Sequence, residues 1–300
     1  MPTIAANTGL RVLLTGANGF IGIWVFRILL EQGYTVRAAV RSLEKSKRLK
    51  ERFASYSDKV EWVIVKDMTK DGAFDDALKD VDAIVHMASP VNGTPGPIPM
   101  VRDPLLTKVK RVVLTSSCAA ITATVEKPTR IFTEDDWGDE FVEACQAQGK
   151  DANERFKYRA SKVLAERGKI GWDLVVLNPP LEVSDDFLKH TYSTIDVRDI
   201  ATAHVASLSN EKAGGERLII SNGAIKVQET RNLIASLKPN LYTNHIFPRG
   251  KPELNSTILL DYNGEKGKRI LGIKYRSREE TFTDTLADFE ARGWLEKPVY

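Results

Sequence analysis

A glycine-rich turn near the N-terminus restricts the fold of this chain more than any other segment. RVLLTGA, residues 11–17, has the apolar character of a buried strand, and a helix pattern begins at about Phe20. Gly16, Gly19 and Gly22 lie at this junction with the spacing G-x-x-G-x-x-G. Such glycines permit a tight turn, close approach of the backbone to a pyrophosphate and close helix–strand packing, and the helix N-terminus offers free N–H groups to phosphate. A turn that needed only a positive φ would not require all three. The junction therefore predicts a dinucleotide-binding unit.

The same alternation of apolar strands and helical segments continues through the first 180 residues. We expect strands at 35–41, 60–67, 82–89, 110–117 and 171–180, and helices at 20–32, 42–56 and 73–80. Strands rich in Val, Ile and Leu that are separated by helices are typical of a parallel sheet covered on both faces. The expected fold class is α/β, a Rossmann-type doubly wound parallel sheet with a small C-terminal substrate-binding cap.

The remaining residues contain fewer strand patterns. Helices are expected at 196–209, 226–237 and 278–292, with one strand at 215–222. We therefore expect residues 1–180 to form an NAD(P)-binding Rossmann domain and residues 181–300 to form mainly the smaller cap. Residues 195–222 are expected to pack back on the Rossmann body.

Composition narrows the possible partners. A net charge of +3, with no run of five or six like charges, does not favour a nucleic-acid surface. Two cysteines in 300 residues do not make a disulfide framework. The most apolar stretch, residues 10–30, contains two arginines and an asparagine and is too polar to span a membrane. The N-terminal residues also lack the pattern of a secretory signal. We expect a cytoplasmic protein with a small-molecule substrate.

The end of the second predicted strand indicates which dinucleotide would bind. An NAD site places an acidic residue there to accept the ribose 2′-OH. This strand instead ends in Arg41, with Arg37 nearby and Lys45 one turn further on. Positive charge suits a 2′-phosphate, so we expect NADPH/NADP+; the alternative is that Arg41 and Lys45 belong to a solvated face. Asp67 and Met68, after the third strand, are candidate adenine contacts or an ordinary turn.

A second group of residues has the chemistry of proton transfer. Tyr158 and Lys162 are four residues apart and share one helix face, which alone is common. The strand at 110–117 ends in Ser116 and Ser117, at the sheet edge where doubly wound folds bind ligands. An adjacent ammonium and the positive nicotinamide would stabilise the tyrosinate, lower the pKa of the tyrosine and favour acid–base work. The nicotinamide would carry the hydride, and these side chains would supply position and charge.

Several motifs in combination resemble the extended short-chain dehydrogenase/reductase superfamily, and the resemblance covers nearly the whole chain. They are TGANGFIG, Ala88-Ser89-Pro90, VVLTSS, YRASK, LNPP and DVRD. The chain is most like fungal NADPH-dependent aldehyde and ketone reductases of the methylglyoxal-reductase type and plant dihydroflavonol reductases. The resemblance implies Tyr158 as proton donor, Lys162 as its tuner and a ribose ligand, and Ser117, in preference to Ser116, as the substrate hydroxyl.

The resemblance also implies a set of cofactor contacts. These are Gly16, Gly19, Phe20, Ile21 and Gly22 at the pyrophosphate, Arg41 and Lys45 at the 2′-phosphate, Asp67 and Met68 at adenine, Ala88 and Lys162 at ribose, and Tyr158, Pro179 and Pro180 near the nicotinamide. No metal is expected, because the four histidines are scattered. The DVRD motif is expected to be a structural turn before a helix.

Relative to the family pattern, the chain is short at three places: 91–108, 166–171 and 181–195. Each shortening lies at an element boundary and rejoins family-like sequence. We interpret them as internal deletions, through altered splicing or a gene-prediction error, with a reduced natural variant as the alternative. They alter segments that would form the substrate pocket and the subunit contacts.

These observations predict an NADPH-dependent carbonyl reductase, monomeric or weakly dimeric, that reduces an aldehyde or ketone. One alternative is an NAD-dependent sugar-nucleotide epimerase or dehydratase of the same superfamily, which Arg41 disfavours. The other, motivated by the three shortenings, is a catalytically impaired nucleotide-binding remnant.

Overall fold

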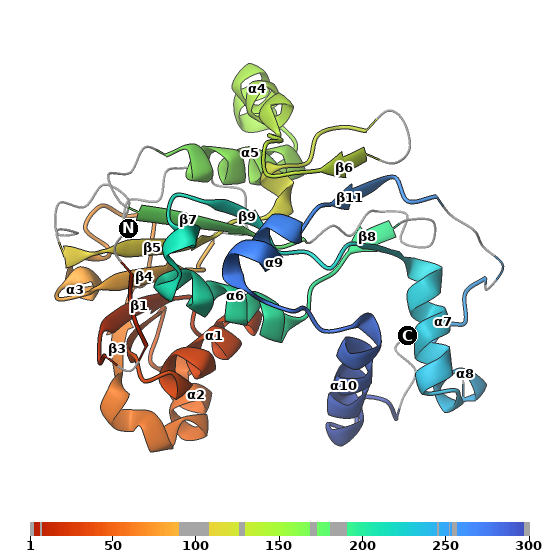
Figure 1. Cartoon of the computed structure of the whole chain (residues 1–300), viewed down its shortest axis with the longest axis horizontal. Coiled ribbons are helices and arrows are strands. Elements are labelled where there is room, and N and C mark those ends of the chain that lie inside the picture. Colours follow the sequence, from red (N-terminus) through yellow and green to blue (C-terminus); the bar gives the residue numbers. More distant parts are fainter. Residues whose placement is uncertain are drawn as a thin grey trace.

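Seven parallel strands form the central sheet of the computed structural model, which describes residues 3–6, 8–89, 108–125, 130–168, 173–180, 191–244, 246–251, 253 and 257–296. The strands are β1 (Arg11–Thr15), β2 (Thr35–Val40), β3 (Val60–Ile64), β4 (Ala83–His86), β5 (Arg111–Thr115), β7 (Asp173–Asn178) and β9 (Arg217–Ile219). Their order is β3-β2-β1-β4-β5-β7-β9, and every neighbouring pair is parallel (Figure 1). Strand order reverses between β1 and β4. The predicted doubly wound α/β class is confirmed.

Helices cover both faces of this sheet. Helices α1 (Phe20–Glu31), α2 (Lys47–Arg52) and α6 (Val197–Ser209) lie on one side, and α4 (Asp139–Gln148) and α5 (Glu154–Arg167) on the other (Figure 1). Alternate strand residues face the two cores: Val12 and Leu14 pack with Phe26 of α1 in the larger cluster. Leu13 packs in the other cluster, beside α3 (Asp75–Leu78). Burial of both faces explains why these strands are apolar at nearly every position.

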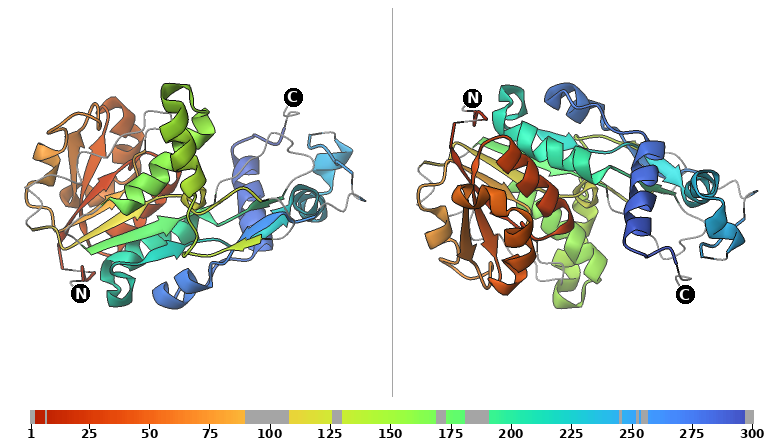
Figure 2. Two further views of the ribbon diagram at one scale, coloured as in Figure 1. Left: turned by 90° about the horizontal axis from the view of Figure 1, so that it is seen from above. Right: turned by 90° about the horizontal axis from the view of Figure 1, so that it is seen from below.

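Beyond residue 180, the chain supplies one strand of the central sheet, β9, and most of the outlying elements. Two small sheets pair β8 (Thr191–Ser193) with β10 (Ala224–Lys226) and β6 (Arg130–Phe132) with β11 (Leu260–Tyr262). The remaining helices are α7 (Val227–Leu237), α8 (Asn240–Thr243), α9 (Glu265–Leu271) and α10 (Arg278–Ala291). Helices α7, α8 and α10 gather at the end of the molecule opposite β3 (Figure 2). Among the described residues, no helix combines the length and apolar character needed to traverse a bilayer.

The helix expected at 42–56 is wrong in its length. The segment instead forms a 3₁₀ turn at Glu44–Ser46, the short α2, and a second 3₁₀ stretch at Ala54–Lys59. Tyr56 leaves helical geometry with φ −112° and ψ 18°. The charged residues have the spacing of one amphipathic helix. In the 3₁₀ turn and in α2, however, only Ser46 and Leu49 are buried. Too little apolar surface faces the core to hold one long helix.

Candidate active site

Backbone atoms crowd the three glycines of the N-terminal turn, most severely Gly22. Gly16 has φ +72°, and a Cβ added there would lie 3.1 Å from the backbone nitrogen of Ala88. A Cβ on Gly22 would lie 2.1 Å from the carbonyl oxygen of Gly16. The Gly19 N–H donates to that same oxygen at 2.9 Å. The backbone is therefore folded so tightly that side chains are excluded, as a close approach to phosphate demands.

The first turn of α1 is suited to an anion. Gly19 caps the helix with extended backbone (φ −79°, ψ 167°) and offers no side-chain acceptor, and the first turn contains no acidic residue. The N–H groups of this turn and the positive end of the helix dipole are thus not neutralised by side chains at the helix start. Phe20 is 78% exposed and Ile21 half-buried beside them. These features fit a pyrophosphate.

Two side chains that the sequence did not single out fix the strand end opposite this turn. The hydroxyl of Thr15 accepts hydrogen bonds from the backbone nitrogens of Met87 (3.1 Å) and Ala88 (3.0 Å). Its own hydrogen is then free to donate to Nδ1 of His86 at 2.9 Å. Burial lowers the pKa of His86 to about 3, so the ring is neutral and suited to accept. Thr15 and His86 hold Ala88 against Gly16.

The basic residues at the end of β2 have different roles. Arg41 and Lys45 are exposed, and within the described part of the chain their side chains form no ion pair. Arg37 is buried, donates to the carboxylate of Glu61 at 2.8–2.9 Å and to the Ala77 carbonyl at 3.0 Å, and is a structural residue. The expectation that Arg37 contributes to the phosphate end is therefore wrong. Arg41 and Lys45 remain available to a 2′-phosphate.

Asp67 and Met68 lie in a turn after β3. Oδ1 of Asp67 accepts from the Thr69 backbone nitrogen (3.0 Å) and hydroxyl (2.7 Å), and these hydrogen bonds lower the pKa of the exposed carboxyl. Met68 is half-buried and packs on the core cluster that contains Val65. Asp67 thus closes its own turn, while its second oxygen faces solvent.

Ser117, Tyr158 and Lys162 come together at the carboxyl end of β5. Ser117 follows the strand and caps the 3₁₀ turn Cys118–Ala120, and its hydroxyl accepts from the Ala119 nitrogen at 3.1 Å. Helix α5, begun by the Asn153 side-chain cap, packs against this turn and carries the other two residues. The Ser117 hydroxyl lies close enough to the Tyr158 phenol to act on its pKa, and Nζ of Lys162 lies 5.6 Å from the centre of the Tyr158 ring. Ser116 instead donates to Glu166 and so points elsewhere.

Burial shifts the pKa of two side chains at this corner. Burial raises the pKa of Tyr158, and the Ser117 hydroxyl opposes that rise. For the protein alone, burial makes the net shift upward; the predicted lowering also included the charge of the nicotinamide, and it stays a prediction. Burial lowers the pKa of Lys162 to about 8, and the charge of Glu166 opposes that fall. Nζ of Lys162 donates to Ser89 Oγ at 3.2 Å and to the Thr115 carbonyl at 3.5 Å.

The proline-ended strand β7 borders the same corner. Pro179 and Pro180 are half-buried, and the Pro179 carbonyl accepts from the backbone nitrogen of Cys118 at 3.0 Å. Asn178 precedes them and donates from Nδ2 to the Ser117 carbonyl at 3.0 Å. Neither Asn178 nor Glu166 was predicted as a site residue. The position of Asn178 directly before two prolines, and of Glu166 one turn after Lys162, was the available signal.

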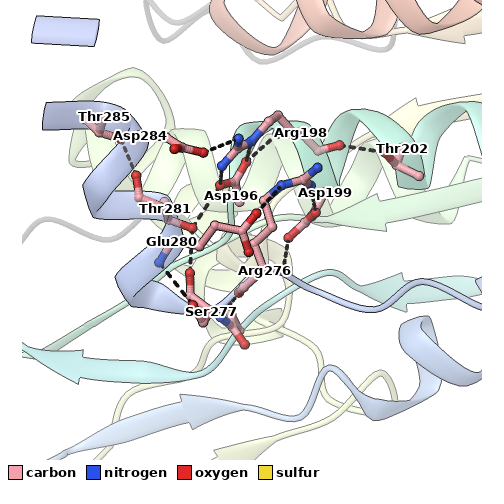
Figure 3. A network of polar contacts seen from close by, with 11 residues as sticks. Asp196, Arg198, Asp199, Thr202, Arg276, Ser277, Glu280, Thr281, Asp284 and Thr285 are labelled. Carbon is pink, nitrogen blue, oxygen red and sulfur yellow. Dashed lines mark hydrogen bonds and ion pairs between the residues drawn. The ribbon is translucent and has the colours of Figure 1, made fainter. Parts of the chain in front are cut away.

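The DVRD motif lies away from this corner and has the structural role expected of it. Asp196 caps α6 and accepts from Arg198 and from Thr281 of α10 (2.8 Å). Asp199 accepts from the backbone and the guanidinium of Arg276. Figure 3 shows these groups joining α6 to α10 and to the chain before it. The motif fixes two helices to each other.

Metal chemistry finds no support in the described part of the chain. No group of three or more His, Cys, Asp or Glu side chains there could hold an ion. His204 is buried; its Nδ1 donates to the Ile200 carbonyl at 2.7 Å and its Nε2 accepts from Thr115 at 2.6 Å. His190 and His245 lie outside the described residues.

Comparison with known proteins agrees with this geometry. Residues 12–97 match the NAD dependent epimerase/dehydratase family. An uncharacterized oxidoreductase of Schizosaccharomyces pombe is 32% identical over 331 residues, which cover 93% of this chain and 96% of that protein. The NADPH-dependent methylglyoxal reductase of Saccharomyces cerevisiae is 29% identical, with 94% of this chain and 100% of that protein covered. The chain belongs to the NAD dependent epimerase/dehydratase family, the extended short-chain dehydrogenase/reductases.

Solved structures and alignment lengths add two findings. The crystal structure of yeast methylglyoxal/isovaleraldehyde reductase complexed with NADPH superposes with a TM-score of 0.78 at 28% identity, covering 95% of this chain and 99% of that one. The alignment with the Saccharomyces protein runs over 344 positions, more than the 300 residues of this chain. That relative therefore has residues where this chain has none, as expected for internal deletions. The three shortened segments, 91–108, 166–171 and 181–195, overlap residues 90–107, 169–172 and 181–190, which lie outside the described residues.

Proposed function

We propose that this chain is an NADPH-dependent carbonyl reductase that acts on an aldehyde or ketone. The observation that carries the proposal is the convergence of Ser117, Tyr158 and Lys162: α5 packs against the Ser117 turn, and the nitrogen of the buried Lys162 side chain lies 5.6 Å from the centre of the Tyr158 ring. A proton donor, an orienting hydroxyl and a cation thus share one corner at the carboxyl edge of the sheet, where doubly wound folds bind ligands.

In this proposal the Ser117 hydroxyl orients the carbonyl oxygen and Tyr158 donates the proton to it. The raised pKa of Tyr158 keeps the phenol protonated, and therefore able to donate, at neutral pH. Lys162 is mostly charged below its pKa of about 8 and stabilises the negative charge that develops on the tyrosine oxygen. When bound, NADPH supplies the hydride.

The cofactor contacts form a path along the strand ends. We assign the pyrophosphate to Gly16, Gly19, Phe20, Ile21 and Gly22, the 2′-phosphate to Arg41 and Lys45, adenine to Asp67 and Met68, ribose to Ala88 and Lys162, and the nicotinamide end to Tyr158, Pro179 and Pro180. The glycine turn excludes side chains, and the first turn of α1 has no acid, which supports the first assignment. The exposure of Arg41 and Lys45, whose side chains form no ion pair with another described residue, supports the second.

We further propose a division near residue 180 into a cofactor-binding part and a mainly C-terminal substrate-binding part. In it, α6 and β9 belong to the cofactor-binding body, which their packing in the large core cluster supports. A small-molecule carbonyl substrate, a cytoplasmic location and a monomeric or weakly dimeric state belong to the same proposal. An NAD-dependent epimerase or dehydratase is the second candidate, and the basic residues at the end of β2 disfavour it.

Titration of the purified protein with NADPH and NADH, followed by fluorescence, tests the cofactor. Oxidation of NADPH in the presence of small aldehydes and diketones then tests the reaction. Tighter binding of NADPH and its oxidation with a carbonyl substrate are expected. A preference for NADH would overturn the cofactor assignment, and binding without turnover would favour the impaired nucleotide-binding remnant.

A further inference from the structure

Helix α5 buries a carboxylate that the proposed mechanism does not use. Glu166 lies one turn after Lys162, and its side chain is 1% exposed. The inward face of α5 therefore carries Lys162 and Glu166 alongside Ala160 and Val163. A buried carboxylate is strongly unfavourable unless its charge is paired and its oxygens accept hydrogen bonds. What Glu166 contacts accordingly indicates its role.

Every hydrogen-bonding neighbour of Glu166 is a donor. Oε1 accepts from the Ser116 hydroxyl and from Nδ2 of Asn178 at 2.7 Å. Oε2 accepts from the guanidinium of Arg217 on β9. Of these three neighbours, the Asn178 NH₂ group and the Arg217 guanidinium can only donate, so two of the three contacts favour the charged carboxylate.

These contacts lead directly to the Ser117 turn. The same Asn178 amide that donates to Glu166 also donates to the Ser117 carbonyl at 3.0 Å. Ser116 is the preceding residue. The carboxylate thus holds the chain on both sides of the Ser117 Cα, so the distance from this turn to α5 depends on it.

Arg217 extends the network into the surrounding backbone. It donates to the carbonyls of Glu134 (2.7 Å) and Asp136 (2.6 Å), and its guanidinium lies 3.6 Å from the ring centre of Trp137. One carboxylate therefore links α5 to the ends of β5 and β7, to β9 and, through Arg217, to the 134–137 loop. Such a rigid support can keep two reacting side chains in register.

Glu166 also acts on the charge of Lys162. The groups that face this ammonium are Tyr158 and Glu166 from α5, Ser89 and the Thr115 carbonyl from the strand ends, and His86 from β4. His86 is neutral, since burial lowers its pKa to about 3. Glu166 supplies the negative charge that opposes the burial-driven fall in the pKa of Lys162.

We propose that Glu166 is a positioning residue for the reductase reaction: it fixes the Ser117 turn against α5 and supplies the negative charge facing Lys162. The proposal rests on the proposed function for its kinetic consequence, although the effect on Lys162 exists without turnover. Glu166 touches neither substrate nor cofactor in this account and acts through Ser117 and Lys162.

Glu166→Gln tests this role. The amide can still accept from Ser116 and Asn178, but its NH₂ group then faces the Arg217 guanidinium and the negative charge is lost. We expect kcat to fall about 100-fold, the scale of a small misplacement of reacting groups. The basic limb of the pH profile of kcat/KM should also move to lower pH, because the pKa of Lys162 falls further. The matched control is Glu154→Gln, an exposed acid on the same helix paired with Lys157, which should keep the kcat and pH profile of the wild type.

A second variant keeps the proposal testable if Glu166→Gln does not fold. Ser116→Ala removes one donor to the carboxylate and leaves the charge and the Arg217 pair in place. We expect a smaller loss of kcat with the basic limb unmoved, because the turn is loosened while the charge remains. Wild-type kcat in Ser116→Ala together with wild-type kcat in Glu166→Gln would overturn the proposal. If the Gln variant does not fold, wild-type kcat in Ser116→Ala alone would do so.

A measurement without turnover separates this proposal from the proposed function. Acylation of Lys162 by acetic anhydride, followed by mass spectrometry across pH, reports the protonation of its amine. The reaction should begin at lower pH in Glu166→Gln than in the wild type or in Glu154→Gln. If the wild type oxidises no NADPH, the reductase assignment fails, and this titration still decides whether Glu166 acts on Lys162. Identical acylation profiles would overturn that action.

Discussion

Two buried acidic clusters in this molecule look alike and do different things. Glu166 is paired with Arg217, and Asp199 with Arg276, and both carboxylate side chains are almost fully buried. The neighbours of Glu166 include the residues on both sides of the Ser117 turn and Lys162. The neighbours of Asp199 belong to the segment before α10 and to α6 itself.

Burial and ion pairing therefore do not by themselves identify a functional residue. An acid and an arginine joined in the interior serve equally well to lock helices together or to support reacting groups. The two clusters differ in what their residues contact next. The first cluster, around Glu166, contacts the Ser117 turn and faces Lys162. The second cluster, formed by Asp196, Asp199 and Arg276, contacts α10 (Figure 3). Changes in the first cluster should therefore alter rates, and changes in the second should alter stability.

Ser117→Ala should have a large effect at the first cluster. Loss of the hydroxyl removes the group that acts on the Tyr158 phenol and orients the substrate oxygen, so kcat should fall about 100-fold. Steady-state oxidation of NADPH measures it. The control is Ser236→Ala, an exposed serine on α7 that bonds only to its own helix and should not affect kcat. A Ser117→Ala enzyme with wild-type kcat would mean that the first cluster supports nothing catalytic.

The next prediction is that kcat/KM and the free energy of unfolding change in opposite directions as pH rises. Lys162 has a folded-state pKa of about 8, below the 10.5 of the unfolded chain. As pH rises above about 8, kcat/KM should fall about tenfold per unit, because the ammonium is lost. Between these two pKa values the unfolded chain binds more protons than the folded one, so this group makes the free energy of unfolding rise with pH.

Comparison with Lys162→Met isolates that contribution from other groups that titrate in the same range. Denaturant unfolding at several pH values should give a free energy that rises more steeply with pH in the wild type than in the Met variant. A parallel pH dependence in the two proteins would contradict the depressed pKa of Lys162.

Asp199→Asn should lower the free energy of unfolding and leave kcat unchanged. The variant leaves the Arg276 guanidinium facing an amide, and since that arginine is 32% exposed, we expect a loss of about 2 kcal/mol in the free energy of unfolding. Denaturant unfolding measures the loss, and kcat per folded molecule should be unchanged. A fall in kcat without a fall in stability would place the second cluster with the first.

The smallest expected effect is that of Thr281→Val. Its hydroxyl donates to Asp196 at 2.8 Å across the α6–α10 contact, and the Val variant preserves the shape while removing that donor. A loss of about 1 kcal/mol is expected, because Arg198 still pairs with the carboxylate. The midpoint of denaturant unfolding checks it, and an unchanged midpoint would remove Thr281 from the network.

Much of the fold and of the reacting group was predictable from local sequence. The apolar strands and the glycine spacing follow from nearest-neighbour chemistry, and Ser117 could be preferred over Ser116 by resemblance alone. The sign of the Tyr158 pKa shift was not predictable, because it depends on how deeply α5 is buried. The roles of Arg37 and Glu166 were equally hidden, since their partners Glu61 and Arg217 lie far away in the chain.

The most direct test of the central claim is Tyr158→Phe in a protein shown to bind NADPH. The Phe ring keeps the packing on α5 and removes only the proton that the mechanism requires. In the Phe variant we expect NADPH affinity to stay close to that of the wild type and kcat for a small aldehyde to fall about 1,000-fold. Turnover at the wild-type rate in the Phe variant would contradict the assignment of Tyr158 as the proton donor.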